Sequence, residues 1–247
     1  LTQLMAKEKG LVVDQEGFNE AMEQARAKSR QHVKLHQANF KEVPMGGEAR
    51  IVTDPVEKLD MAKHHTSTHL LQAALREVLG SHVYQAGSLV DTDHLRFDFS
   101  HFQAIDKATL AKIEAMINQK IKDNIEVEAF EKPLEEAKSM GAMALFGEKY
   151  GNVVRVVVMD KDYSVELCGG THVSRTGDIG LFKIVSEGGV AAGIRRVEAV
   201  TGENALTLVQ TLAARVSEAA AALKVQPDEI ANRIAQVQDQ VKSLEKE

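Results

Sequence analysis

The side chains best suited to chemistry are three histidines and the single cysteine, which lie in two short segments. His65 and His69 enclose Thr-Ser-Thr in a stretch with helical periodicity. A spacing of four puts both imidazoles on one face of a helix, one turn apart, where they can share a metal ion. Cys168 and His172 enclose Gly-Gly-Thr, a flexible turn at the end of an expected strand. Three imidazoles and a thiolate suit tetrahedral zinc, and one weak or displaced ligand would leave a position for water.

Each half of this set also has a simpler explanation. A histidine pair on a helix is usually solvated surface or a hydrogen-bonded structural pair, and a lone cysteine is usually a small buried hydrophobe. Together the two halves favour a metal site, because both lie on ordered elements about 100 residues apart. The neighbouring His64 is turned by about 100° from His65 around a helix, so we assign it to the flank of the pair.

The residues between the two helical histidines include no general base. No glutamate lies between His65 and His69, so the zinc-binding patterns of zincins and deaminases are absent. Such a site would rely on metal-held water, on Thr68, or on hydroxyl groups of the substrate.

Several elements must position these residues. Apolar side chains at helical spacing predict a helix over residues 56–79, ending at Gly80. Asp106 caps a second predicted helix that runs to about Asp123, and a short helix follows Pro133 and ends near Gly141. Alternating and β-branched runs predict strands, the last two around a Gly188-Gly189 turn: Gly87–Val90, Leu95–Phe99, Ile125–Phe130, Val153–Met159, Tyr163–Leu167, Gly180–Ser186 and Ile194–Val200. This order predicts an α+β fold, a mainly antiparallel sheet with helices packed on one face.

The two ends of the chain differ from this middle part. Residues 1–31 have a helical pattern, with Asp14 as the cap of a helix over residues 15–30, and residues 32–55 resemble a linker with a weak strand at Ala49–Val52. Residues 203–247 contain two apolar stripes, the second with heptad spacing from Ile230 to Leu244. We therefore expect a C-terminal helical or coiled-coil hairpin, which could mediate a homodimer.

Bulk composition narrows the class of protein. The 247 residues are 44% hydrophobic and 27% charged, as in a globular domain, and a single cysteine excludes an internal disulfide and suits the reducing cytoplasm. The sequence has no apolar run of about 18 residues, so we expect no membrane span. With a net charge of −6, any contact with RNA would depend on local basic patches. The first residue is not methionine, which suggests a fragment or a processed chain.

Five motifs in this order resemble one family. They are His65-Thr-Ser-Thr-His69-Leu-Leu, Arg96-Phe-Asp-Phe-Ser-His101, Gly141-Ala-Met-Ala-Leu-Phe-Gly-Glu-Lys-Tyr150, Cys168-Gly-Gly-Thr-His172 and Thr176-Gly-Asp-Ile-Gly180. From about residue 56 to residue 202 the chain resembles the editing domain of alanyl-tRNA synthetases, closest to the bacterial form. Residues 1–31 are similar to the end of the tRNA-recognition region, residues 32–55 would be a linker or a reduced barrel segment, and residues 203–247 are similar to the start of the C-terminal coiled-coil region.

The resemblance implies hydrolysis of Ser-tRNA(Ala) and Gly-tRNA(Ala), with Zn²⁺ held by His65, His69, Cys168 and His172. It also places Thr68 and Gln85 near the substrate. The full-length enzyme would attach alanine to tRNA(Ala) with ATP, but the aminoacylation domain is absent from this sequence. Family members usually have a small β-barrel before the histidine helix, and residues 32–55 are too short for one.

For the remaining candidates a functional and a structural role stay open. Thr68 could bond the serine hydroxyl of the substrate or merely a carbonyl of its own helix, and Gln85 could be an ordinary surface amide. Arg195 and Arg196 are the best candidates for contact with the tRNA backbone, ahead of Lys149, Arg175 and Lys183.

Three functions fit the sequence. The first is the deacylase domain of a larger synthetase. The second is a freestanding trans-editing deacylase, and the third is a non-catalytic, zinc-stabilised module that binds RNA or dimerises.

Overall fold

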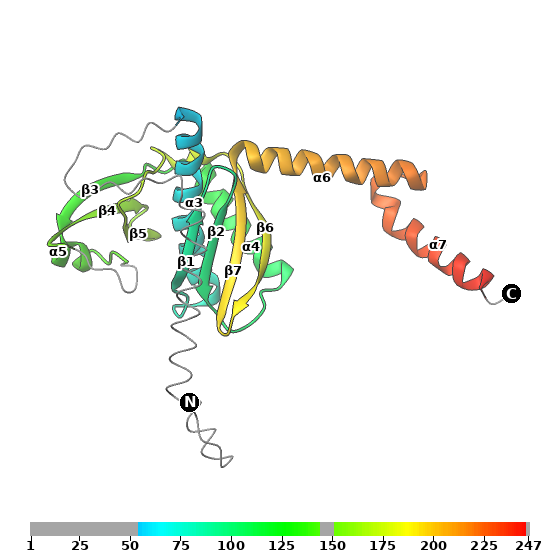
Figure 1. Cartoon of the computed structure of the whole chain (residues 1–247), viewed down its shortest axis with the longest axis horizontal. Helices are drawn as coiled ribbons and strands as arrows, with labels where there is room; N and C mark the ends of the chain where they lie inside the picture. Colours follow the sequence, from blue (N-terminus) through cyan, green and yellow to red (C-terminus); the bar gives the residue numbers. More distant parts are fainter. Residues whose placement is uncertain (1–53, 144–150, 246–247) are drawn as a thin grey trace, which may run out of the picture. The chain divides into compact units, whose positions relative to one another are not determined.

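The computed structural model describes residues 54–143 and 151–245 (Figure 1). Several predictions lie outside the described residues: the helix over residues 15–30, the strand at Ala49–Val52, nearly all of the linker 32–55, and Lys149.

Helix α3 (Pro55–Leu79) carries the first half of the candidate site, within one residue of the predicted bounds. Asp54 begins the helix, because its Oδ1 accepts a hydrogen bond of 2.7 Å from the Val56 amide, and Pro55 needs no such partner. The helix ends at Gly80, whose φ of 115° suits a residue without a Cβ. Its buried face includes Leu70, Leu71, Ala74 and Leu75.

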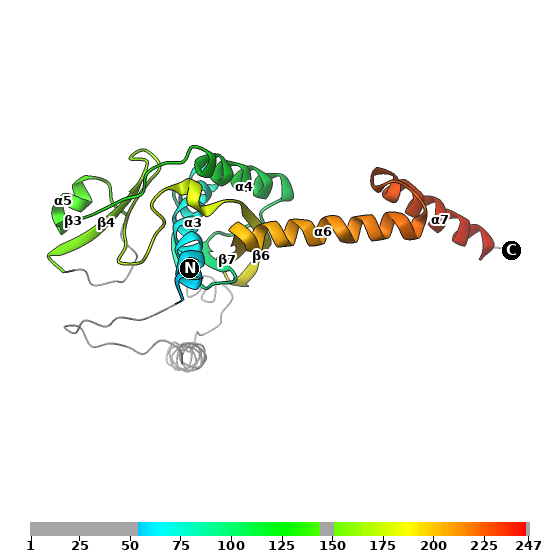
Figure 2. The same cartoon turned by 90° about the horizontal axis from the view of Figure 1, so that it is seen from above.

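A four-stranded antiparallel sheet packs against α3 and α4 (Lys107–Lys122) (Figure 2). The side chains of Leu95, Phe97 and Phe99 are buried and alternate with half-buried polar residues, so the helices cover one face of the sheet. Asp106 caps α4 through the Thr109 amide, as predicted. In spatial order the strands are β1 (Gln85–Val90), β2 (Leu95–Ser100), β7 (Ile194–Thr201) and β6 (Phe182–Ala191).

A second antiparallel sheet is separate from the first, whereas the sequence predicted one. Strand β4 (Val153–Met159) lies between β3 (Glu128–Pro133) and β5 (Ser164–Leu167). Both faces of β4 are apolar: Val157 and Met159 join the main core, while Val154, Val156 and Val158 pack with α5 (Leu134–Ser139) in a smaller cluster. The side chains on the two faces of β4 therefore pack into two different cores, and the second sheet lies between them.

The turn between the last two strands is not where we predicted it. Gly188 and Gly189 lie inside β6 and pair with Arg196 and Arg195. The chain turns at residues 192–193 instead, where Gly193 adopts a φ of 72°. A left-handed conformation favours glycine at that turn, and the strand simply tolerates the other two glycines.

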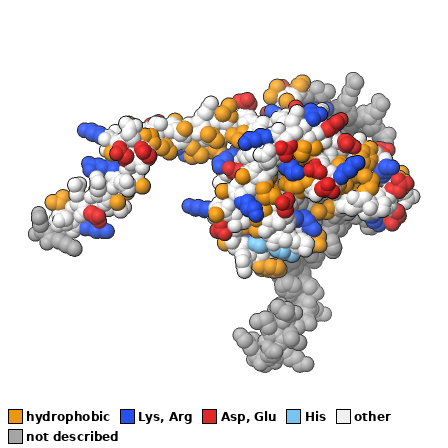
Figure 3. Space-filling model, turned by 180° about the vertical axis from the view of Figure 1, so that it is seen from behind, with side chains coloured by type: hydrophobic (Ala, Val, Ile, Leu, Met, Phe, Trp, Pro, Cys, Tyr) orange, Lys and Arg blue, Asp and Glu red, His pale blue; other side chains and the backbone are white. Residues whose placement is uncertain are grey.

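The C-terminal part is helical, as predicted. It consists of α6 (Gly202–Leu223), a short 3₁₀ turn at Pro227–Glu229 and α7 (Ile230–Leu244). The expected hairpin does not bury its apolar seam, because the stripe side chains of both helices remain exposed, and hydrophobic side chains follow α6 in Figure 3. They are Leu206, Val209, Leu212, Val216, Ile234, Val237, Val241 and Leu244. None of the helices in the described part of the chain is long and apolar enough to cross a bilayer.

Candidate metal centre

Helix α3 presents two of the predicted ligands side by side. The ring centroids of His65 and His69 are 5.2 Å apart, as expected for residues one turn apart on a single face. His69 is buried and His65 is half-buried. The spacing of four residues on one helix is therefore enough to bring His65 and His69 together.

The turn after β5 supplies the other two ligands. The ring of His172 lies 4.4 Å from that of His65, and Cys168 Sγ lies 3.4 Å from His65 Nε2. Thr66 fixes this turn to α3, because its Oγ1 accepts a hydrogen bond of 3.1 Å from the Val173 amide. Long-range packing thus completes the set.

The Cys-Gly-Gly turn is also held from the neighbouring strand. Arg155 on β4 donates from Nη1 to the carbonyl oxygens of Cys168 and Gly170, at 2.9 and 2.7 Å. Cys168 also donates its own backbone amide to the Arg155 carbonyl. The thiolate ligand therefore comes from a turn fixed on both sides.

The donor atoms of the four residues all lie within 4.8 Å of one another. Tetrahedral zinc with bonds of about 2.0–2.3 Å separates its ligand atoms by roughly 3.3–3.8 Å, so the set needs to contract only slightly around an ion. Imidazole nitrogen and thiolate sulfur are both ligands that zinc takes in proteins.

In two of the histidines, Nδ1 contacts a neighbouring side chain and Nε2 has no hydrogen-bond partner among the described residues. His69 Nδ1 lies 2.6 Å from Glu166 Oε2, and His172 Nδ1 lies 3.4 Å from Thr66 Oγ1. The Nε2 atoms of His69 and His172 are buried and have no hydrogen-bond partner among the described residues. A buried polar atom without a partner is costly, and a metal ion between the rings would satisfy both.

The cluster favours a charged thiolate. Burial raises the pKa of the Cys168 thiol, but the three facing imidazoles outweigh it and bring the pKa to about 3. Burial lowers the pKa of His69, but the negative charge of Glu166 and the contact with Cys168 outweigh it and raise the pKa to about 10. Burial lowers the pKa of His172. The thiolate is therefore ready to bind a cation at neutral pH.

His64 lies outside this set, as predicted, and it is fully buried. Its Nδ1 lies 2.8 Å from the Asp91 carbonyl oxygen, and its Nε2 accepts a hydrogen bond of 3.2 Å from the Thr201 amide. Both nitrogens are therefore used to tie α3 to the sheet.

The two residues expected near the substrate have different surroundings. Thr68 is 4% exposed, and its Oγ1 donates to the His64 carbonyl oxygen at 2.9 Å, the bond expected within a helix. Gln85 begins β1 and donates to Ser88 Oγ at 3.0 Å. None of the hydrogen bonds of Gln85 to described residues reaches the metal cluster.

The predicted RNA-binding arginines are both paired with carboxylates. Arg196 donates to the two carboxylate oxygens of Asp98 at 2.6 and 2.8 Å. Arg195 makes a similar two-point contact with Glu187, and these pairings raise the pKa of both arginines. Lys183 is paired with Glu114, and Arg175 donates to the Asn124 carbonyl oxygen.

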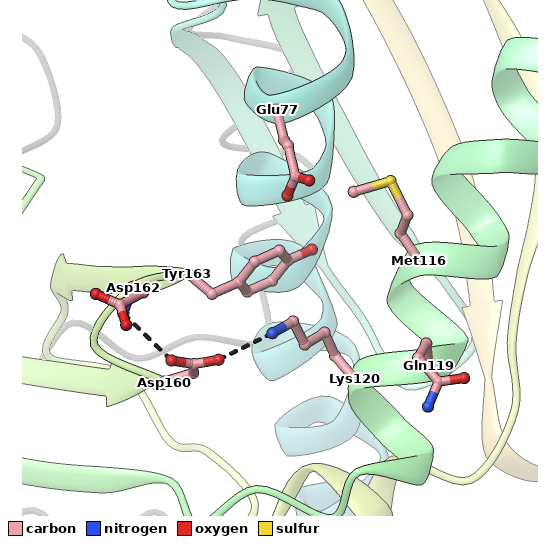
Figure 4. A pocket seen from close by; sticks show the side chains of 7 residues that line it. All are labelled: Glu77, Met116, Gln119, Lys120, Asp160, Asp162 and Tyr163. Carbon is pink, nitrogen blue, oxygen red and sulfur yellow. Dashed lines mark hydrogen bonds and ion pairs between the residues drawn. The ribbon is translucent and has the colours of Figure 1, made fainter.

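A cavity of about 310 Å³ lies apart from the cluster, beside the turn between β4 and β5 (Figure 4). Lys120 on α4 points toward Asp160 and lies over the Tyr163 ring, with Nζ 2.9 Å from Asp160 Oδ2. Burial raises the pKa of Tyr163, whose hydroxyl donates to the Leu70 carbonyl oxygen. These contacts join the second sheet to the two helices, so we assign the cavity walls a structural role.

Sequence reasoning missed the residues that surround the ligands: Glu166, Thr66 and Arg155. One signal was available for Glu166. It falls two residues before Cys168, in the same alternating register as the buried Ser164. A carboxylate at a buried strand position needs a partner, and that pattern could have marked it.

Comparison with known proteins places the site in context. The model of the family described as threonyl and alanyl tRNA synthetase second additional domain matches residues 154–198, which include Cys168 and His172. Alanine–tRNA ligases of Burkholderia mallei, Burkholderia pseudomallei and Burkholderia thailandensis are each 56% identical to the chain over 216 residues. These matches cover 87% of this chain and 24% of each relative, so the chain spans about a quarter of their length.

Proposed function

We propose that the chain is the editing part of an alanine–tRNA ligase. It is homologous to a portion of such enzymes that includes the second additional domain. It would hydrolyse the ester of Ser-tRNA(Ala) and Gly-tRNA(Ala) at a zinc site. Residues 56–202 would form the deacylase domain and residues 203–247 the start of the C-terminal region. The longer protein would attach alanine to tRNA(Ala) with ATP.

The observation that carries this proposal is the joining of two distant segments into one donor set. His65 and His69 on α3 meet Cys168 and His172 from the turn after β5. Three of these four side chains are only half-buried, so a substrate would approach the cluster from their exposed side. When bound, zinc would orient the ester or polarise a water beside it.

Thr68 is the residue we assign to recognition of serine. Its hydroxyl hydrogen is used in the bond to the His64 carbonyl, which leaves the oxygen lone pairs free to accept a hydroxyl from the substrate. An alanyl ester has no hydroxyl to donate, so this contact would discriminate against it. Gln85 remains a second candidate on the strength of the family resemblance.

Deacylation assays would test this function directly. We expect the chain to hydrolyse Ser-tRNA(Ala) rapidly and to spare Ala-tRNA(Ala), with about one zinc per chain measured on the same sample. Cys168→Ala should abolish hydrolysis and lower the zinc content. Thr68→Val should keep zinc and lower the rate on the seryl ester by about 10-fold, because only the hydroxyl is removed.

A second function has one observation in its favour. Four protein ligands are typical of structural zinc sites, whereas catalytic sites usually have three and an open position. A non-catalytic, zinc-stabilised module would bind zinc and lose thermal stability with a chelator. It would hydrolyse neither Ser-tRNA(Ala) nor Ala-tRNA(Ala). That result would exclude the editing function for this chain.

A further inference from the structure

Glu166 is a buried carboxylate paired with one of the four candidate ligands. Only 6% of its side chain is exposed, and its Oε2 lies 2.6 Å from Nδ1 of His69, which is itself 9% exposed. Ser164 Oγ lies 3.4 Å from the other carboxylate oxygen. A buried charge of this kind is stabilised only by a close donor or an opposite charge, and His69 provides it.

The contact determines which nitrogen of His69 faces the cluster. A carboxylate oxygen accepts, so Nδ1 must carry the proton in this bond. The remaining nitrogen, Nε2, is then the atom that would offer its lone pair to a bound ion, and it is buried without a hydrogen-bond partner among the described residues. With an ion bound, the contact with Glu166 would therefore fix the orientation and the tautomer of the ring from the side opposite the other donors.

Two negative charges near the cluster also favour a cation. A divalent ion in the cluster would meet one negative charge from the Cys168 thiolate and a second from Glu166 behind His69. Together they offset the two positive charges of the ion inside a partly buried site, where an uncompensated charge is costly. A neutral residue at position 166 would remove one of these two negative charges.

We propose that Glu166 is a positioning residue for the metal centre: it holds His69 as the Nδ1–H tautomer with Nε2 toward the ion, and its charge strengthens binding. This inference rests on the zinc site of the proposed function. Glu166 is not one of the four ligands, but the affinity for zinc would depend on it.

Zinc affinity, measured on the full chain by competition with a chromogenic chelator, tests this role. Glu166→Gln keeps the shape of the side chain and removes its charge, and we expect the dissociation constant for zinc to rise by about 10- to 100-fold. Glu187→Gln is the matched control, because Glu187 is an equally buried carboxylate, 6% exposed, paired with Arg195. It should leave the affinity within about threefold of the unsubstituted chain. Equal affinities for all three proteins would overturn the proposal.

A second measurement needs no variant and so does not depend on how well Glu166→Gln folds. A long-range proton–nitrogen correlation spectrum of the zinc-loaded chain reports which nitrogen of each histidine bears a proton. We expect His69 to show a protonated Nδ1 and a metal-bound Nε2, and the opposite tautomer would overturn the role of Glu166. A chain that binds no zinc would refute the metal site itself, whereas failure of deacylation alone would refute only the editing function.

Discussion

The backbone of Gly170 lies directly against the imidazole of His65. A Cβ added to this glycine would lie 1.9 Å from His65 Cε1 and 2.4 Å from Nδ1, closer than any real contact. The turn that carries Cys168 therefore also supports a ligand from α3. The adjacent Gly169 differs, because a Cβ there would meet nothing within 4 Å.

These two glycines provide a matched pair of substitutions. Gly170→Ala should displace the His65 ring and raise the dissociation constant for zinc by at least about 10-fold, with loss of deacylation. Gly169→Ala should leave zinc affinity nearly unchanged. Chelator competition on both variants measures the difference, and equal affinities would show that His65 does not depend on the close approach of the turn.

His64 should make stability fall as the pH is lowered. Burial lowers its pKa in the folded chain below the ordinary value of 6.5. The unfolded chain therefore binds a proton first as the pH falls, and the free energy of unfolding decreases by up to about 1.4 kcal/mol per pH unit below pH 6.5. The stability that neutral His64 provides is complete above pH 6.5 and is lost below it.

Urea unfolding of the metal-free chain at several values from about pH 7 to about pH 5 measures this effect. His64→Gln should be less stable throughout, because it cannot satisfy both the Asp91 carbonyl and the Thr201 amide as the imidazole does. Its stability should also vary less with pH. The pKa values of His101 and His172 are lowered as well, but both residues are present in each protein. Parallel curves would contradict the assignment to His64.

Arg195 and Arg196 offer a test of tRNA binding. Replacing both with Ala should weaken tRNA binding and reduce the slope of log affinity against log salt by up to about 2, one for each phosphate that an arginine no longer neutralises. The paired carboxylates Glu187 and Asp98 would be left without these partners, so the thermal midpoint should fall too. A lower midpoint with an unchanged salt slope would assign both arginines to structural ion pairs alone.

The exposed stripe on the C-terminal helices predicts a homodimer. Val209 and Val216 are 40% and 46% exposed on α6, a spacing of seven that repeats on one helix face. Sedimentation of the full chain should give a dimer mass, and Val209→Glu with Val216→Glu should give a monomer with unchanged zinc content. A monomer before substitution, or a dimer after it, would refute dimerisation through this stripe.

Much of the local structure could be predicted from residue patterns. The bounds of α3 follow from apolar spacing and those of α4 from the cap at Asp106, and the structure confirms the predicted strands Gly87–Val90 and Leu95–Phe99, which pair as β1 and β2. Within each pair of predicted ligands the donors also lie on one side, as the spacing of the pair requires. These features depend on neighbours in sequence, which a single sequence displays.

Features that depend on distant contacts could not be predicted. The sequence shows Glu166, Thr66 and Arg155 only as ordinary polar residues, since their roles arise when β4, β5 and α3 pack together. The burial of His64, the pairing of Arg196 with Asp98 and the split into two sheets likewise depend on which surfaces meet. The sequence by itself determined which residues could bind a metal ion, because helical and turn spacing are local. Only the tertiary structure decided how their rings are oriented and what surrounds them, because those depend on side chains about 100 residues away.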